Sequence, residues 1–136
     1  MKRILLKILA AASILTACDP SNTEIPDVPS AGNILVLNNG NWGGNDACIT
    51  IYDSKTGAIT ANAFQKANGQ NLGDLGQDIL VAGNELYIAV NGSQVVFVTD
   101  YDLKVKKTIT AEADGNKLSP RCFAKGNGKV YVARLA

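Results

Sequence analysis

Short apolar runs recur along the chain after residue 32, and Gly, Asn and Asp residues separate them. The runs are rich in Val, Ile, Thr and Tyr and contain no apolar stripe at helical spacing, which is typical of β-strands. Pairs such as Gly83-Asn84 and Asn91-Gly92 suit tight hairpin turns. We therefore expect an all-β fold, with strands at about 33–38, 47–53, 57–61, 77–82, 85–91, 94–100, 104–110, 119–125 and 129–134.

The predicted strands repeat along the chain. Residues 86–89 (LYIA) match residues 130–133 (VYVA) at an offset of 44, and residues 48–53 match residues 95–100 at an offset of 47. Residues 34–37 align with residues 86–89 at an offset of 52. A four-stranded unit of about 45 residues is typical of a β-propeller blade.

This repeat predicts a β-propeller of four-stranded antiparallel blades, of which only about two are present. Residues 33–61 would supply the second to fourth strands (B–D) of a first blade, and residues 77–110 one full blade. Residues 119–134 would start a third blade with its first two strands. Because even a small propeller closes with about four blades, we expect residues 33–136 to be a partial propeller, truncated relative to the complete domain.

The beginning of the chain has a different pattern. Lys2, Arg3 and Lys7 overlap an apolar run over residues 4–15, which is too short to span a bilayer. The run ends in Leu-Thr-Ala-Cys, which resembles a bacterial lipobox with Cys18 as the lipidated residue. An ordinary signal peptide with an incidental cysteine is the alternative.

We therefore predict a lipoprotein signal peptide over residues 1–17 and a Pro-rich tether over residues 18–32, beginning at the lipidated Cys18. Lipid on Cys18 would anchor the protein to the outer membrane. The acidic residues Asp19 and Glu24 are similar to surface-export signals, which favours the cell surface.

The composition of the chain argues against several types of functional site. The chain has 13 basic and 12 acidic residues and no histidine. The near-neutral balance argues against a nucleic-acid binder, and without histidine the chain cannot form a Ser-His-Asp triad. Cys18, Cys48 and Cys122 show no CxxC spacing. We expect no catalytic residues, no metal site and no cofactor, and we expect Cys48 and Cys122 to be buried free thiols.

Several short segments occur in an order that is similar to a known family. The chain resembles the YncE-like seven-bladed β-propeller surface lipoproteins of Bacteroidetes, which include the BtuG-type cobalamin-capturing proteins. The segments are Asn38-Asn39-Gly40-Asn41-Trp42, Asn68-Gly69, Leu72-Gly73-Asp74, Gln77-Asp78, Leu86-Tyr87-Ile88 with Asn91 and Ser93, and Ser119-Pro120-Arg121.

The resemblance implies a surface receptor that binds a ligand, cobalamin or a related corrinoid being the best known, and passes it to a TonB-dependent transporter. The alternatives are an enzyme on a propeller scaffold, of the lactonase or quinone-dependent dehydrogenase type, and a glycan or protein adhesion module. Fold alone does not decide between them.

The candidate ligand residues lie in the loops that would open on one face of a propeller, at 39–46, 62–76, 91–93 and 111–120. Uncharged donors and acceptors beside one tryptophan suit a neutral polar ligand with amide or hydroxyl groups. Gln77 and Arg121 stand at equivalent strand starts and could point into the axial funnel. The loop set is Asn41, Trp42, Asn45, Asn68, Gln70, Asn71, Asn91 and Ser93.

Each of these residues also has a structural interpretation. Asn is favoured in tight turns whatever else it does. Trp42 could cap the core of a blade, and Arg121 could donate to carbonyl groups of a neighbouring blade.

Overall fold

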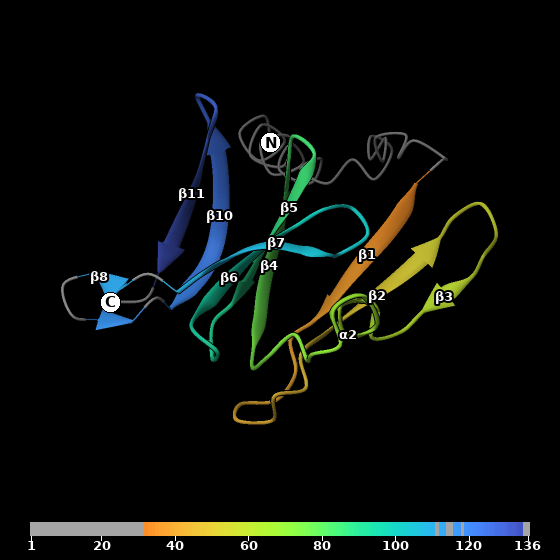
Figure 1. Ribbon diagram of the computed structural model, residues 1–136, viewed down its shortest axis with the longest axis horizontal. Coiled ribbons are helices and arrows are strands. Elements are labelled where there is room, and N and C mark those ends of the chain that lie inside the picture. Colours follow the sequence, from red (N-terminus) through yellow and green to blue (C-terminus); the bar gives the residue numbers. More distant parts are fainter. Residues whose placement is uncertain (1–31, 111, 114–115, 118, 135–136) are drawn as a thin grey trace, which may run out of the picture. The chain divides into compact units, whose positions relative to one another are not determined.

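Antiparallel hairpins build the part of the chain that the computed structural model describes, residues 32–110, 112–113, 116–117 and 119–134 (Figure 1). The strands fall into four antiparallel sheets, with strand orders β1-β2-β3, β4-β5-β6-β7, β8-β9 and β10-β11. The all-β class is confirmed. The sheets do not by themselves make up a propeller arrangement. The strands are β1 (Asn33–Asn38), β2 (Cys48–Asp53), β3 (Ile59–Thr60), β4 (Gly76–Ala82), β5 (Glu85–Val90), β6 (Val95–Thr99), β7 (Val105–Ile109), β8 (Glu112–Ala113), β9 (Asn116–Lys117), β10 (Pro120–Gly126) and β11 (Lys129–Arg134).

One helix and one small ribbon were not expected from the sequence. The helix α2 (Ala63–Asn68) lies within the predicted loop 62–76, and the ribbon β8–β9 lies within the predicted loop 111–120. The helix forms because Ala63 and Phe64 are buried against the sheet, and it ends at Gly69, whose left-handed φ of 69° closes the last turn.

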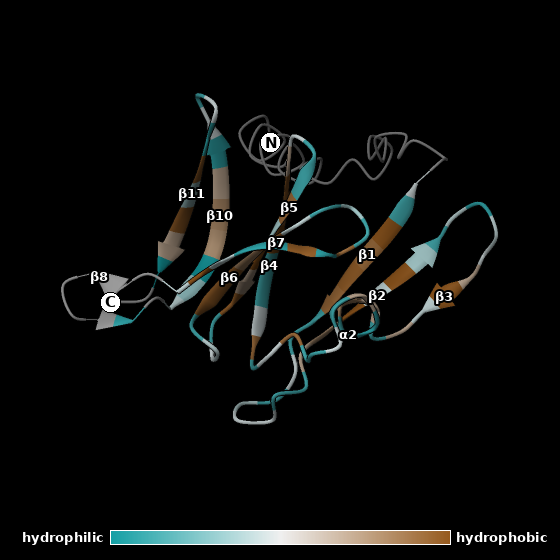
Figure 2. Cartoon of the chain, viewed as in Figure 1, coloured by the Kyte–Doolittle hydropathy of each residue, from teal (hydrophilic) through white to brown (hydrophobic). Residues whose placement is uncertain are grey.

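The main core lies between β1–β2–β3 with α2 and one face of β4–β7. Ile49 on β2 packs in one cluster with Leu86 and Ile88 of β5, all fully buried. The rings of Phe64 and Phe97 lie 5.0 Å apart. In Figure 2 brown, the hydrophobic colour, covers most of β1 and part of β2. Burying each such side chain stabilises the fold by about 1.5–3 kcal/mol.

The opposite face of β4–β7 contacts β10. Tyr87 on β5 lies against Phe123 on β10, with ring centroids 6.2 Å apart. The backbone N–H of Phe123 donates to Oδ2 of Asp78 at 2.7 Å. The sheet β4–β7 is therefore covered on both faces by other sheets of the same chain.

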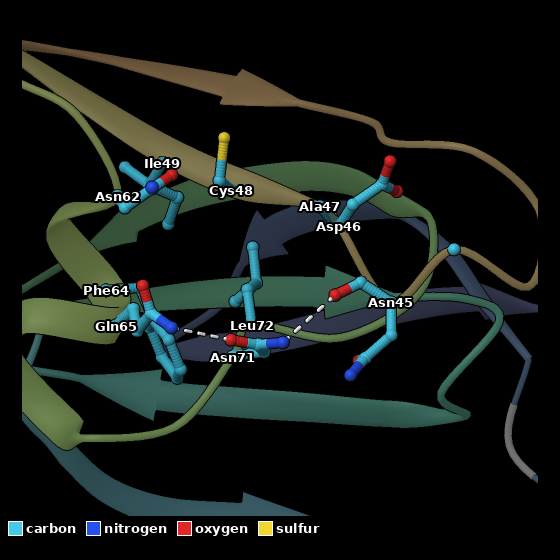
Figure 3. A pocket seen from close by; sticks show the side chains of 11 residues that line it. Asn45, Asp46, Ala47, Cys48, Ile49, Asn62, Phe64, Gln65, Asn71 and Leu72 are labelled. Atoms are coloured by element: carbon cyan, nitrogen blue, oxygen red, sulfur yellow. Dashed lines mark hydrogen bonds between the residues drawn. The ribbon is translucent and has the colours of Figure 1, made fainter.

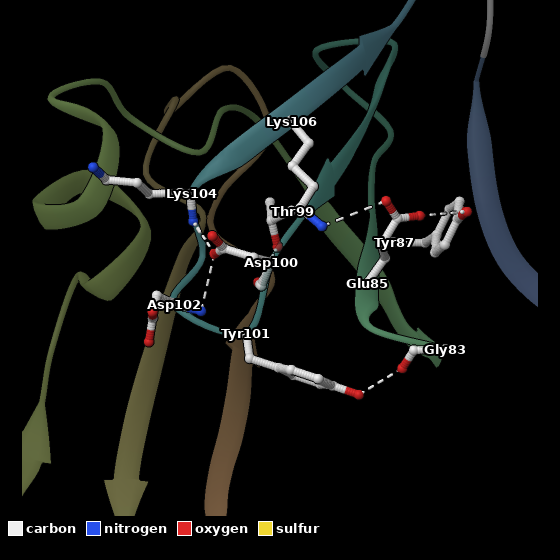
Figure 4. A network of polar contacts seen from close by, with 9 residues as sticks. All are labelled: Gly83, Glu85, Tyr87, Thr99, Asp100, Tyr101, Asp102, Lys104 and Lys106. Atoms are coloured by element: carbon white, nitrogen blue, oxygen red, sulfur yellow. Dashed lines mark hydrogen bonds and ion pairs between the residues drawn. The ribbon is translucent and has the colours of Figure 1, made fainter.

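The turn between β6 and β7 is held by Asp100 (Figure 4). Its Oδ1 accepts from the backbone N–H groups of Asp102 at 3.0 Å and Lys104 at 2.9 Å. The Tyr101 hydroxyl donates to the Gly83 carbonyl at 2.7 Å, which ties this turn to the β4–β5 hairpin. Asp100 and Asp102 are therefore turn residues.

Cys48 and Cys122 were predicted to be buried free thiols, and the prediction of burial is wrong. Cys48 and Cys122 are both free, but Cys48 is only partly buried and Cys122 is exposed. Both side chains alternate onto the outer sides of their sheets. Nδ2 of Asn38 donates to the Cys48 sulfur at 3.4 Å. The predicted signal peptide, Cys18 and the tether up to residue 31 lie outside the described residues. No helix in the described part of the chain is long and apolar enough to cross a bilayer.

Candidate functional site

Loop 39–46, α2 and the segment after α2 enclose a cavity of about 360 Å³ (Figure 3). Four buried apolar side chains contribute to its wall, namely Ala47, Ile49, Phe64 and Leu72. The side chain of Cys48 points away from Asn71 and Leu72, so this residue borders the cavity through its backbone (Figure 3). The remaining lining residues are Gly44, Asn45, Asp46, Asn62, Gln65 and Asn71.

Side-chain amides form a connected row along the rim. Nε2 of Gln65 donates to Oδ1 of Asn71 at 2.8 Å, and Nδ2 of Asn71 donates to the backbone carbonyl of Asn45 at 3.3 Å. The Asn45 carboxamide makes no hydrogen bond to another described residue. Because a carboxamide both donates and accepts, the rim can bind a neutral ligand that presents amide or hydroxyl groups.

Two carboxylates hold the loop that carries Trp42. Asp46 accepts from the backbone N–H of Asn41 and from its Nδ2, both at 2.7 Å. Oδ2 of Asp74 accepts from the Gly43 N–H at 2.9 Å. The hydrogen bonds from Asn41, its backbone N–H first, hold the pKa of Asp46 below its ordinary value.

Gly40 makes the close return of this loop possible. Its φ of +80° lies in the left-handed region, and a Cβ there would come within 2.6 Å of the Ala47 nitrogen. The loop carries Trp42, whose side chain is 79% exposed. The indole therefore caps no core among the described residues and is available for stacking.

A second polar row joins the starts of two strands to the end of a third. Nη1 of Arg121 on β10 donates to Oε1 of Gln77 on β4 at 3.0 Å. Nε2 of Gln77 in turn donates to Oδ1 of Asn39, just after β1, at 3.4 Å. The structure thus brings Gln77 and Arg121 together, and the partner of Arg121 is a side-chain amide and not a backbone carbonyl.

Two candidate ligand residues bond to backbone groups of the fold. Nδ2 of Asn68 donates to the carbonyls of Phe64 and Leu103 at 2.9 and 2.8 Å, and its Oδ1 accepts from the Val105 N–H at 3.0 Å. Asn91 is buried and donates to the Pro120 carbonyl at 3.2 Å. Both carboxamides therefore have hydrogen-bond partners within the fold, and their role in ligand binding stays a prediction.

The other candidates lie in four different places. Asn41 bonds Asp46 and shapes the loop, while Asn45 lies on the cavity rim. Gln70 is exposed on the segment that follows α2. Ser93 accepts from the Asp74 N–H through its hydroxyl at 2.8 Å, so it serves the neighbouring turn.

The comparison with known families gives one match. A family model described as a domain of unknown function (DUF5074) matches residues 32–133. The chain belongs to the DUF5074 family. A search of curated proteins found no match.

In this DUF5074 chain, sequence reasoning missed Gln65, Asn62 and Asp46 as cavity residues. Gln65 lies on α2, in a segment that the sequence pattern assigned to a loop. The hydrogen bonds between Asn41 and Asp46 span five residues. The one sequence signal for these hydrogen bonds was an Asn followed five residues later by an Asp in a Gly-rich loop.

Proposed function

We propose that this protein is a lipid-anchored cell-surface receptor that binds a neutral polar small molecule and passes it to a TonB-dependent transporter of the outer membrane. Cobalamin or a related corrinoid is the specific candidate ligand. The observation that carries the proposal is the row of amides over an apolar wall at the cavity of Figure 3.

The chemistry of the rim supports a neutral ligand. Asn45, Asn71 and Gln65 offer amide groups, and the one lining carboxylate, that of Asp46, has both oxygens occupied by Asn41. Corrinoid side chains end in amides, which pair with carboxamides in both directions. A cavity of about 360 Å³ lies at the small end of the range for ligand pockets, so it would receive one edge of a ligand of this size.

Trp42 supplies a second type of contact. Its indole is 79% exposed beside the loop that borders the cavity, and a flat aromatic side chain can stack on the face of a macrocycle or a sugar ring. Asp46 and Asp74 hold the backbone of loop 39–46, so the backbone that carries Trp42 need not be ordered anew when a ligand binds.

We further propose that the sheets are parts of a β-propeller. The sheet β4-β5-β6-β7 is a four-stranded antiparallel meander, as a blade would be. The Asn39 carbonyl after β1 accepts from Gly76 at the start of β4, so the end of β1 meets the beginning of β4. That direction fits β1 as a second strand of its blade, as the repeat predicts.

The anchoring and the partner rest on the sequence. The lipobox at Cys18 and the Pro-rich tether support a lipoprotein, and the order of motifs that resembles the YncE-like lipoproteins supports delivery to a transporter. No observation in the described part of the chain favours the enzyme alternative over binding.

Calorimetric titration of the full chain with cyanocobalamin tests the proposal. Removing a buried indole contact costs about 1–3 kcal/mol, so Trp42→Ala should weaken binding roughly 10- to 150-fold. Asn84→Ala is the matched control, because Asn84 is exposed in the β4–β5 turn. We expect the native chain and Asn84→Ala to bind equally well, and Trp42→Ala alone to bind more weakly.

The absence of binding by the full chain would overturn the corrinoid assignment. Neutral oligosaccharides are titrated in parallel, because sugar hydroxyls use the same amide chemistry. Binding of oligosaccharides and not cyanocobalamin would assign the protein to glycan adhesion.

A further inference from the structure

The cavity of Figure 3 has room for one substituent of a large ligand. Its volume is about 360 Å³, whereas pockets that enclose a whole drug-sized molecule range from about 300 to 1,000 Å³. A ligand as large as a corrinoid therefore places one side group in the cavity and keeps the rest of its surface outside. The lining residues determine which chemical group fits.

The wall of the cavity is apolar. Ile49 of β2, Phe64 of α2 and Leu72 after α2 contribute to it, each at most 2% exposed. Water gains no hydrogen bonds beside such side chains, so a methyl or methylene group that displaces this water is favoured. The group that enters the cavity therefore has a short apolar stem.

The amide rim has donors and acceptors left for a ligand. A carboxamide nitrogen has two hydrogens, and Nδ2 of Asn71 directs one of them to the backbone carbonyl of Asn45 at 3.3 Å. Gln65 bonds Asn71 through its Nε2, while its Oε1 accepts from no other described residue. The Asn62 side chain makes no capping hydrogen bond to α2. The rim can therefore donate to a ligand and accept from it.

A carboxamide is the neutral group that uses such a rim most fully. It presents two N–H hydrogens and one carbonyl oxygen, whereas a hydroxyl group has one hydrogen and a carboxylate has none. A bound carboxylate would cover acceptors of the rim, such as Oε1 of Gln65, without donating to them. An acceptor that loses water and gains no partner is costly, so the rim favours the amide over the acid.

The charge at the cavity also disfavours a carboxylate. Asp46 is the one charged residue among the described lining residues, and Lys66 of α2 is not among them. The two oxygens of Asp46 accept from Asn41 at 2.7 Å, and hydrogen bonds to a carboxylate favour its charged form. A second carboxylate would lose water beside this charge, with no cation in the lining to pair with it.

We infer that the cavity selects a carboxamide on a short alkyl stem and rejects the corresponding carboxylate. This selectivity rests on the proposed receptor function and narrows it to one chemical group. Two sources carry that group, namely the acetamide and propionamide side chains of a corrinoid and the acetamido group of an N-acetylated sugar.

Calorimetric titration of the full chain with two matched pairs of probes tests the selectivity. Cyanocobalamin is compared with its monocarboxylic acids, each of which has one side-chain amide hydrolysed to a carboxylate. Triacetylchitotriose is compared with cellotriose, which has a hydroxyl group in place of each acetamido group. In the pair whose amide form binds, we expect a loss of affinity of about 10- to 100-fold when the amide that enters the cavity is replaced.

A cation placed in the rim should reverse the preference within the cobalamin pair. Gln65→Arg keeps an N–H donor for Oδ1 of Asn71 and adds the positive charge that the lining lacks. This variant should bind the rejected monocarboxylic acid at least about 10-fold more tightly than the native chain does. Asn84→Arg is the matched control, because it adds the same charge at the exposed β4–β5 turn and should leave both affinities unchanged.

The outcomes separate the site from the receptor function. Discrimination within the cobalamin pair supports the carboxamide site with a corrinoid as its source, and discrimination within the sugar pair alone supports the site with an N-acetylated glycan as its source. Equal binding within the pair whose amide form binds, or a gain in Gln65→Arg no larger than that in Asn84→Arg, would overturn the carboxamide site and leave the receptor function standing. Binding of neither cyanocobalamin nor triacetylchitotriose would overturn both.

Discussion

The variant Asn68→Ala tests whether the Asn68 carboxamide stabilises the fold or binds a ligand. Its carboxamide connects α2 to the β6–β7 turn and β7 through hydrogen bonds to Phe64, Leu103 and Val105. Asn68→Ala removes all of them and leaves the Leu103 carbonyl and the Val105 N–H without this partner. Leu103 adopts a left-handed φ of 63°, so the turn at this residue depends on such support.

The expected loss can be worked out from these contacts. A partly buried polar group left without a partner costs about 1–3 kcal/mol. Two such groups remain, so Asn68→Ala should lower the free energy of unfolding by about 2–6 kcal/mol. Urea denaturation of the full chain, followed by circular dichroism, measures this. Asn84→Ala should change the same free energy by no more than about 0.5 kcal/mol.

Ligand affinity completes the test. Per folded molecule, Asn68→Ala should bind cyanocobalamin as the native chain does, because Asn68 faces the chain's own carbonyl groups. An unfolding free energy within 0.5 kcal/mol of the native chain, together with a weakened affinity, would refute our assignment of Asn68 to the fold.

Three further changes have clear expectations. Hydrogen bonds lower the pKa of Asp46 in the folded state, so the loop order that they provide is present above the ordinary aspartate pKa and is lost as the pH falls through the lower folded-state pKa. The fluorescence emission of Trp42, the sole tryptophan, should follow that acid transition. The variant Asp46→Asn should not show the transition. Gly40→Ala should destabilise the chain by about 1–3 kcal/mol, more than Gly57→Ala, whose Cβ would meet nothing within 4 Å; equal losses in denaturation would contradict the close packing of the loop. Cys18→Ala should abolish metabolic labelling with palmitate and release the protein from the membrane fraction, and unchanged labelling would disprove the lipobox.

The strands of the central sheet were predictable because their apolar residues follow one another in short continuous runs. Residues 85–90 and 95–99 place apolar side chains on both sides of a sheet that is covered on both faces, and such runs stand out in a sequence. The helix α2 was missed because six residues are too few to show a helical period. Its stability comes from packing of Phe64 and not from helix propensity.

The candidate site was only partly predictable for a similar reason. A sequence identifies amides but not their partners. Asn45 and Asn71, 26 residues apart, meet only because α2 turns the chain back toward loop 39–46. In the sequence Asn68 and Asn91 looked equivalent to them, because the same residue type serves in turns and in ligand binding.

Hydrogen–deuterium exchange of the full chain, with and without cyanocobalamin, tests the location of the site most directly. Our account predicts that the ligand slows exchange in residues 39–46 and 62–73 and leaves the β4–β5 hairpin turn at Gly83 and Asn84 unchanged. Protection confined to that hairpin or to the β10–β11 turn, or no protection at saturating ligand, would contradict it.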